Sequence, residues 1–309
     1  MSGIPSSFTD EKRNKNYMLN IFEIVKQKGK APEGQEKGTA KRPPKKAKPA
    51  RPAATGPPGL VGVDEAGRGP VMGPLVVVAL RVQNDAILRD LNVKDSKVLT
   101  PARRGALYDE IMPLSKVAIE VISAEEIDTL RRSVTINEIE LDVFAAAIGK
   151  VLHDGDTIYV DAADVREKYF GEEISLRLNA GRCDAVFNMV SKHKADAIYP
   201  VVSAASIIAK VTRDRAIVAI EKELRKTLDR PLGSGYPSDP VTITFIENWI
   251  KKEGDFPPYI RRSWDTARHI MEMAKVTTLD SYGLWTKSEE DLRGKRKSDD
   301  DPKRDGTDE

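Results

Sequence analysis

The chain has 309 residues, 40% hydrophobic and 32% charged with a net charge of +2, which is enough to bury a core of about 200 residues beneath an ionic surface. Its longest apolar run, Leu75–Leu80, is far shorter than the roughly 20 residues that cross a bilayer, and the N-terminus lacks the apolar stretch of a signal peptide, so we expect an intracellular protein without a membrane span. Cys183 is the only cysteine, which excludes an internal disulfide and a zinc site of several thiolates.

The two ends of the chain differ in composition from its middle. Residues 1–58 hold 13 Lys/Arg against 5 Asp/Glu and include a Lys/Pro/Ala/Gly-rich stretch from Gly29 to Pro58, which predicts a disordered basic tail. Such a tail can bind polyanions by releasing counterions, although many charged tails only solvate a protein. Residues 286–309 are charged and nearly free of apolar side chains, so we predict a second disordered tail. Residues 59–285 then form one folded domain.

The folded part opens with predicted strands. Apolar, largely β-branched runs occupy residues 60–63, 74–82 and 117–122, as is typical of buried strands. A glycine-rich turn separates the first two. We therefore expect the first strands to be antiparallel neighbours.

Helical spacing follows these strands. Apolar residues recur at near-helical intervals from Ile136 to Leu152, and Thr135 with Glu138 matches a capping box. The remaining predicted elements are strands at 157–160 and 185–190 with a helix between them, and helices at 201–228, 240–253 and 264–278. This order predicts an α/β fold in which helices cover both faces of a mixed sheet and further helices extend the C-terminal end.

Acidic residues stand at or near the ends of three predicted strands. Asp64 and Glu65 follow the first, Asp161 follows the strand at 157–160, and Asp196 lies just beyond the strand at 185–190. A carboxylate left buried and unpaired costs several kcal/mol, so each must reach solvent, a basic partner or a metal. Taken singly, turn carboxylates and helix N-caps are the alternatives. Taken together, carboxylates on one sheet edge favour a Mg²⁺ or Mn²⁺ site that can cleave a phosphodiester.

A glycine-rich turn follows the first acids. Gly67, Gly69 and Gly73 suggest a dinucleotide fingerprint, but that motif needs a helix to begin within it, whereas Pro70 and Val76–Val78 continue as a strand. We expect instead that the backbone around Arg68 closely approaches a sugar or phosphate. A tight structural turn is the alternative.

The chain resembles type 2 ribonuclease H in its archaeal and eukaryotic form. The resemblance covers about residues 59–268 and rests on five motifs in one order. They are GVDEAGRGP at Gly62–Pro70, KDSK at Lys94–Lys97, YVD at Tyr159–Asp161, the segment Lys194–Arg215 that contains YPVVSAAS, and GSGYPSD at Gly233–Asp239. The resemblance implies a ribonuclease H-like fold. It also implies an endonuclease that hydrolyses the RNA strand of RNA/DNA hybrids and cuts at single ribonucleotides in duplex DNA, leaving 3′-hydroxyl and 5′-phosphate ends by two-metal-ion catalysis.

Site residues follow from the resemblance, motif by motif. The implied catalytic and metal-binding residues are Asp64, Glu65, Asp161 and Asp196. The Gly67-Arg68-Gly69 turn corresponds to the family's reader of the ribose 2′-hydroxyl, and Tyr236 to its stacking partner for the adjoining deoxyribose. The positions that resemble contacts to the substrate backbone, with helix-face salt bridges or packing as the alternative, are Lys97, Ser203, Ser206, Lys210 and Arg213.

A possible partner peptide lies near the C-terminus. Thr277–Tyr282 partly resembles the peptide with which archaeal members dock on the sliding clamp, but Val276 stands where a Gln is expected and Gly283 where the second aromatic is expected. The resemblance implies a cytoplasmic monomer in an archaeon, and a nuclear protein with accessory subunits in a eukaryote.

Two rival functions stay open. One is a nucleic-acid-binding protein that does not cleave, which the four intact acids argue against. The other is a DNA nuclease of the same superfold, which the Gly-Arg-Gly turn and Tyr236 argue against.

Overall fold

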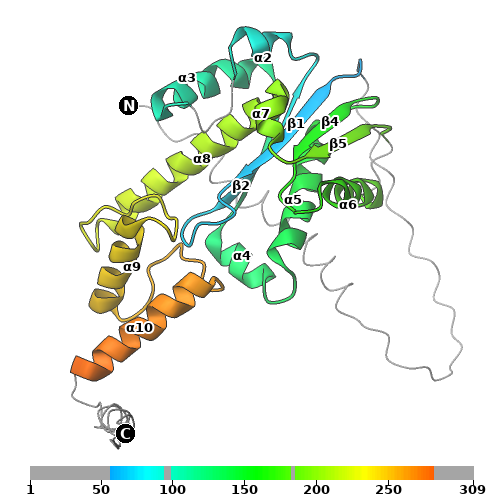
Figure 1. Cartoon of the computed structure of the whole chain (residues 1–309). Helices are drawn as coiled ribbons and strands as arrows, with labels where there is room; N and C mark the ends of the chain where they lie inside the picture. The colour runs from blue at the N-terminus through cyan, green and yellow to red at the C-terminus, as the bar shows by residue number, and fades with distance from the viewer. Residues whose placement is uncertain (1–55, 94–98, 182–184, 282–309) are drawn as a thin grey trace, which may run out of the picture.

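The computed structural model describes residues 56–93, 99–181 and 185–281 (Figure 1). The strands are β1 (Leu60–Ala66), β2 (Leu75–Val82), β3 (Lys116–Ile122), β4 (Thr157–Asp161) and β5 (Asn188–Lys192). The helices are α2 (Ala86–Asp90), α3 (Pro101–Ile111), the 3-10 helix η2 (Met112–Leu114), α4 (Ala124–Leu130), α5 (Ile136–Val151), α6 (Glu167–Ala180), α7 (Ala195–Ile198), α8 (Pro200–Leu224), α9 (Pro240–Glu253) and α10 (Asp265–Ser281).

One mixed sheet organises the molecule. Its strand order is β3-β2-β1-β4-β5. Strand β2 pairs antiparallel with both β1 and β3, whereas β4 pairs parallel with both β1 and β5. The predicted antiparallel start is therefore confirmed. The central strand β1 has an antiparallel neighbour on one side and a parallel neighbour on the other.

Helices cover both faces of the sheet, as the strand and helix order predicts. The long helix α8 crosses one face together with α2 and α3, and α5 and α6 cover the other face (Figure 1). Alternate residues of β2 divide between these faces: Val76 and Val78 pack beneath α8, whereas Leu75 and Val77 pack beneath α5. Every residue of β2 is buried, which explains its unbroken apolar run.

The crossing of α8 over β1 requires a residue without a side chain. A Cβ atom on Gly62 would lie 2.2 Å from the carbonyl oxygen of Val201 and 2.6 Å from the nitrogen of Val202. The backbone of α8 therefore lies directly on β1, two residues before Asp64. Pro200 occupies the first turn of α8, where its missing N–H costs no hydrogen bond.

Three element boundaries illustrate how sequence pattern and backbone relate. The predicted capping box is present: the hydroxyl of Thr135 accepts from the N–H of Glu138, whose side chain accepts from the N–H of Thr135. The last strand begins at Asn188 rather than at residue 185, because Ala185 and Phe187 pack on the core from a loop, while Val186 between them is exposed. Helix α8 ends at Leu224 rather than at residue 228, although Leu228 still packs on the C-terminal apolar cluster.

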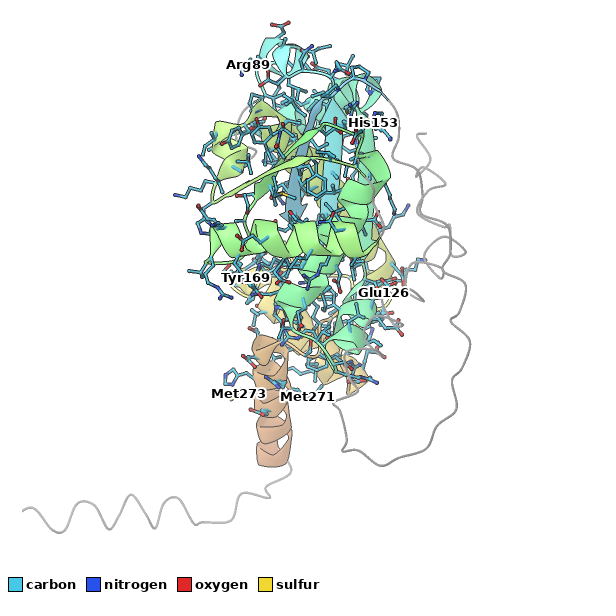
Figure 2. The ribbon with its side chains drawn as sticks, turned by 90° about the vertical axis from the view of Figure 1, so that its right-hand side faces the viewer. Arg89, Glu126, His153, Tyr169, Met271 and Met273 are labelled. Carbon is cyan, nitrogen blue, oxygen red and sulfur yellow. The ribbon has the colours of Figure 1, made fainter. Side chains whose placement is uncertain are left out.

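The C-terminal helices form a separate layer around the turn between β1 and β2. Val71 and Met72 of this turn pack with Phe245 and Trp249 of α9, and Met72 forms a β-bridge with Ile260. Figure 2 looks onto α6 and shows α10, with Met271 and Met273, extending away from the sheet. Within the described ranges no helix is both long and apolar enough to span a bilayer.

Candidate active site

Three aspartates meet where the central strands end. Val63 on β1 lies opposite Val160 on the parallel strand β4, so Asp64 and Asp161 follow at the same level. Asp196 lies in α7, shortly after β5. Carboxylate oxygens of Asp64, Asp161 and Asp196 all lie within 4.8 Å of one another. The sheet thus gathers acids from three distant parts of the sequence into one cluster.

The connection from β5 to α8 brings Asp196 to this cluster. Lys194 adopts a left-handed backbone with φ of 55° and turns the chain from β5 into α7. The N–H of Ala195 then donates to Oδ1 of Asp161 at 3.1 Å, and the hydroxyl of Ser203 on α8 donates to the carbonyl oxygen of Asp196. Asp196 is only 1% exposed, so its carboxylate is held against the sheet rather than presented to solvent.

The fourth predicted acid, Glu65, adjoins the cluster. Its N–H donates to Oδ1 of Asp64 at 2.7 Å. Burial raises the pKa of Glu65 to about 8, and the charges of Glu140 and Asp161 add to that shift. Burial also raises the pKa of Asp64 well above its usual value, helped by the charges of Glu65 and Asp161 and opposed by a hydrogen bond with Ser206.

The residues present fit a divalent metal. The four side chains supply only carboxylate oxygens, the ligands that hard divalent cations prefer. The pKa values of Asp64 and Glu65 are raised mainly by burial, and the charges of neighbouring acids add to the shift. A divalent cation bound between them would offset both the cost of burying these carboxylates and their mutual repulsion. The residues whose oxygens are close enough to hold it are Asp64, Asp161 and Asp196, and Glu65, which adjoins them, stays a predicted fourth ligand.

The turn after β1 has a backbone that only glycine adopts easily. Gly67 has a φ of +95°, and a Cβ atom there would lie 2.5 Å from the carbonyl oxygen of Pro74. The side chain of Arg68 is bound to the scaffold: its guanidinium donates to Glu140, to Asn137 and to the carbonyl oxygen of Ala163, at 2.5–2.8 Å. A substrate that reaches this turn therefore meets mainly its backbone.

Glu140 was not singled out from the sequence. It lies on α5, is completely buried, and pairs through Oε2 with Arg68. Burial raises its pKa to about 7 although Arg68 and Arg261 oppose the shift. The available signal was an acid inside the apolar run of a helix, between Ile139 and Leu141, where a charge is costly unless it has a partner.

A second glycine-rich turn stands beside the first. Gly235 has a φ of +81°, and its carbonyl oxygen accepts from the N–H groups of Val71 and Met72 at 2.9 and 3.1 Å. A Cβ atom on Gly69 would lie 3.9 Å from the ring of Tyr236, so the two predicted substrate-reading elements are in contact range.

Arg213 is buried against the second glycine-rich turn and binds its backbone. It is 1% exposed, its Cζ lies 4.9 Å from the centre of the Tyr236 ring, and its Nη2 donates to the carbonyl oxygen of Ser234 at 3.0 Å. Burial lowers its pKa, an effect that the nearby Tyr236 and Asp214 oppose. Its side chain thus positions a turn, while its predicted phosphate contact stays a prediction.

The other predicted substrate residues lie in different surroundings. Ser203 is buried, and its hydroxyl donates to the carbonyl oxygens of Asp196 and Tyr199. Lys210 forms an ion pair with Asp214 on the next turn of α8. Lys97 lies outside the described residues. Their contacts with a substrate remain predictions.

Comparison with known proteins agrees with this geometry. The family model described as ribonuclease HII matches residues 61–267, which contain all four acids and both glycine-rich turns. The chain belongs to the ribonuclease HII family. Ribonuclease HII of Pyrococcus abyssi is 46% identical over 228 residues, which cover 72% of this chain and 96% of that protein. The chain is therefore a ribonuclease H, a metal-dependent endonuclease of a family that cleaves the RNA of RNA/DNA hybrids.

Solved structures of ribonuclease HII share the fold. The crystal structure of ribonuclease H2 from Pyrococcus horikoshii is 43% identical, with a TM-score of 0.61, and covers 70% of this chain and 99% of that one. Ribonuclease HII of Archaeoglobus fulgidus, solved in complex with PCNA, is 36% identical, with a TM-score of 0.60, and covers 68% of this chain and 96% of that one. The predicted ribonuclease H-like fold and family are confirmed.

Proposed function

We propose that this ribonuclease HII cuts at single ribonucleotides embedded in duplex DNA as well as within longer RNA/DNA hybrids, leaving 3′-hydroxyl and 5′-phosphate ends. The observation that carries the proposal is the position of the two turns. The first begins directly after β1, which bears Asp64 and Glu65, and its Gly69 lies against the ring of Tyr236. The turn proposed to read ribose and the ring proposed to stack thus follow directly on the strand that carries two of the acids proposed to hold the metal.

The acids provide a rigid set of carboxyl oxygens. Asp64 and Asp196 are almost completely buried. Their carboxylates are therefore held in place by packing within the sheet and α7, and do not move as exposed side chains would. Two Mg²⁺ or Mn²⁺ ions held by these acids would lower the pKa of an attacking water and would stabilise the leaving 3′-oxygen. The role of the protein is to hold the scissile phosphate in line with these oxygens.

Specificity for ribose requires a donor or acceptor that meets the 2′-hydroxyl, the group that distinguishes RNA from DNA. The Gly67-Arg68-Gly69 turn suits this role because its backbone is exposed at Gly69 and its arginine side chain is turned away into the scaffold. Tyr236 would stack on the next sugar, where a ring tolerates deoxyribose. Such a site needs only one ribonucleotide.

Three duplexes of one sequence test the proposal: an RNA/DNA hybrid, a DNA duplex with one ribonucleotide, and an all-DNA duplex. With Mg²⁺ or Mn²⁺ we expect cleavage of the first two at defined positions, no cleavage of the third, and no cleavage of any in EDTA. Cutting of the hybrid alone would refute single-ribonucleotide activity. Cutting of the all-DNA duplex would favour a DNA nuclease, and no cutting at all would favour a binding protein.

A sliding clamp is the proposed protein partner. The Archaeoglobus relative was solved with PCNA, and Thr277–Tyr282 partly resembles a clamp-docking peptide. Residues up to Ser281 continue α10, and Tyr282 lies outside the described residues. Titration calorimetry of the full chain against an archaeal clamp should detect binding that Leu279→Ala weakens. Binding unaffected by this change would exclude the peptide as the docking element.

A further inference from the structure

Arg261 lies beneath the Gly67-Arg68-Gly69 turn and is completely buried. It reaches the turn from the loop between α9 and α10, nearly two hundred residues away in sequence. Its Nη2 donates to the carbonyl oxygen of Gly67 at 2.6 Å and its Nη1 to that of Arg68 at 2.9 Å. Nε and Nη2 donate to the carbonyl oxygen of Gly73 at 3.1 and 3.0 Å. One guanidinium therefore holds both ends of the loop that joins β1 to β2.

The guanidinium is itself fixed in place. The N–H of Arg261 donates to the carbonyl oxygen of Val71 at 2.8 Å, and its Cζ lies 4.9 Å from the centre of the Trp264 ring. Burial, with the charge of Arg213, lowers its pKa to about 9, which still leaves it charged at neutral pH. Within the described ranges no carboxylate lies within ion-pair distance of Arg261. Its charge is thus compensated chiefly by the carbonyl dipoles of the turn.

The geometry of the peptide bond determines where the N–H groups of this turn point. In a trans peptide the C=O and N–H groups point in opposite directions, and the described residues contain no cis peptide. The carbonyl of Gly67 shares its peptide with the N–H of Arg68, and the carbonyl of Arg68 shares its peptide with the N–H of Gly69. Because both carbonyls point at Arg261, both N–H groups point away from it. The third carbonyl, of Gly73, precedes Pro74 and brings no N–H.

Those two N–H groups have no acceptor within the part of the chain that the structure describes. Gly69 is exposed, so the pair can be reached from outside. A carbonyl that accepts a bond from a charged donor also polarises its peptide, which makes the N–H on the other side a stronger donor. The turn thus presents two adjacent, oriented donors over a buried cation.

We propose that Arg261 is the positioning residue of the ribose reader: it fixes the Arg68 and Gly69 amides as a pair of donors for one substrate oxygen, which under the proposed function is the ribose 2′-hydroxyl. Lysine cannot replace it, because a single ammonium lacks the planar fork that reaches three carbonyls at once. A purely structural cross-link between loop and C-terminal segment is the competing explanation.

Discrimination between ribose and deoxyribose in binding separates these explanations. The full-length Asp64→Asn protein, which should bind without cleaving, is titrated by fluorescence anisotropy with a duplex that contains one ribonucleotide and with the all-DNA duplex of the same sequence. The ratio of the two dissociation constants measures ribose reading. Arg261→Lys should lower this ratio about tenfold or more, while affinity for the all-DNA duplex, which rests on phosphate contacts, stays within about twofold.

Arg262→Lys is the matched control. Its side chain is largely exposed and pairs with Asp255 at 2.9 Å, away from the turn, so the ratio should not change. If Arg261→Lys shows no cooperative melting transition and so is not folded, the same measurement is made on Arg261→Gln, whose amide keeps a planar donor without charge. A preserved ratio, or a parallel loss of both affinities, would overturn the positioning role. A parent protein that shows no preference for the ribonucleotide would instead overturn ribose reading in the proposed function.

Discussion

Arg68 donates from Nη1 to Oε2 of Glu140 at 2.5 Å, which joins the turn after β1 to the middle of α5. Glu140 is completely buried, whereas the side chain of Arg68 keeps about a third of its exposure. In this pair the acid is shielded from solvent, whereas the arginine is partly exposed and can be substituted without opening the core. Substituting the cation alone leaves a carboxylate in the core without its closest positive charge.

Arg68→Met should lower the free energy of unfolding by about 2 kcal/mol or more, because the buried acid loses its partner. The double variant Arg68→Met/Glu140→Gln should recover most of that loss, since it buries no charge. Urea denaturation of both single variants, the double variant and the unmodified protein gives the coupling free energy. Additive losses would show that Arg68 and Glu140 do not depend on each other.

The contact between β1 and α8 predicts a second effect on stability. Gly62→Ala places a Cβ within 2.2–2.6 Å of backbone atoms of Val201 and Val202, which cannot move aside as a side chain could. We expect a loss of about 3 kcal/mol. Gly105→Ala in α3 is the matched control, because a Cβ there meets no atom within 4 Å. It should stabilise the helix by about 0.5–1 kcal/mol, as measured by the shift in melting temperature.

The raised pKa of Glu65 predicts how metal-free stability depends on pH. Its folded pKa of about 8 exceeds its usual 4.5, so between these values the folded protein keeps a proton that the unfolded chain has lost. Stability in EDTA should therefore fall as pH rises from 5.5 to 8. Glu65→Gln cannot titrate and should lose less over the same range. If the melting temperatures of the two proteins fell equally over this pH range, the raised pKa of Glu65 would be contradicted.

Metal should reverse this trend. Because bound cations need the carboxylates deprotonated, Mg²⁺ or Mn²⁺ competes with protons at the cluster. Added metal should therefore raise the melting temperature more at pH 8 than at pH 6.

Asp64→Asn should reduce cleavage of a hybrid by roughly a thousandfold, because it removes a charged oxygen from the centre of the acid cluster. Hybrid affinity should stay within about threefold, since phosphate contacts dominate it. Single-turnover rates and anisotropy titrations measure the two quantities. Asp229→Asn, at a carboxylate that is 88% exposed, is the control and should cleave normally. Near-normal cleavage by the Asp64 variant would remove this residue from the metal site.

Tyr236 offers a test of junction recognition. Tyr236→Ala removes a ring that stacks over Arg213 beside Gly69, and it should slow cleavage at a single ribonucleotide at least about tenfold more than cleavage of a long hybrid. Tyr236→Phe keeps the ring and should keep the preference. The ratio of kcat/KM on the two substrates is the measurement. Equal losses on both would mean that the ring has no special role at the junction.

Much of the scaffold could be predicted from local pattern. The period of the apolar residues located β1 to β4, α5 and α9, because each of these elements repeats its pattern, and the capping box at Thr135 marked the start of α5. Short helices such as α2 and α7 were missed, since four or five residues hold too little periodicity. The strand near residue 188 was placed too early, because buried loop residues such as Ala185 have the composition of a strand.

Some residues of the site could likewise be found from the sequence, and others could not. The acids stand out because they lie at or near the ends of apolar strands, and their order along the chain matches the family. Arg261 gave no such signal: it is one of two adjacent arginines, and only the tertiary structure distinguishes it, buried under the turn, from the exposed Arg262. Contacts between residues far apart in the sequence leave no local pattern to read.

The parallel pairing of β1 with β4 also constrains how the protein folds. Asp64, Asp161 and Asp196 become neighbours only after strands that are distant along the chain have paired, and such long-range closures are the slow steps of folding. Until then each acid is an ordinary, weakly binding carboxylate. Metal affinity should consequently appear late during refolding, and bound metal should slow unfolding far more than it speeds folding.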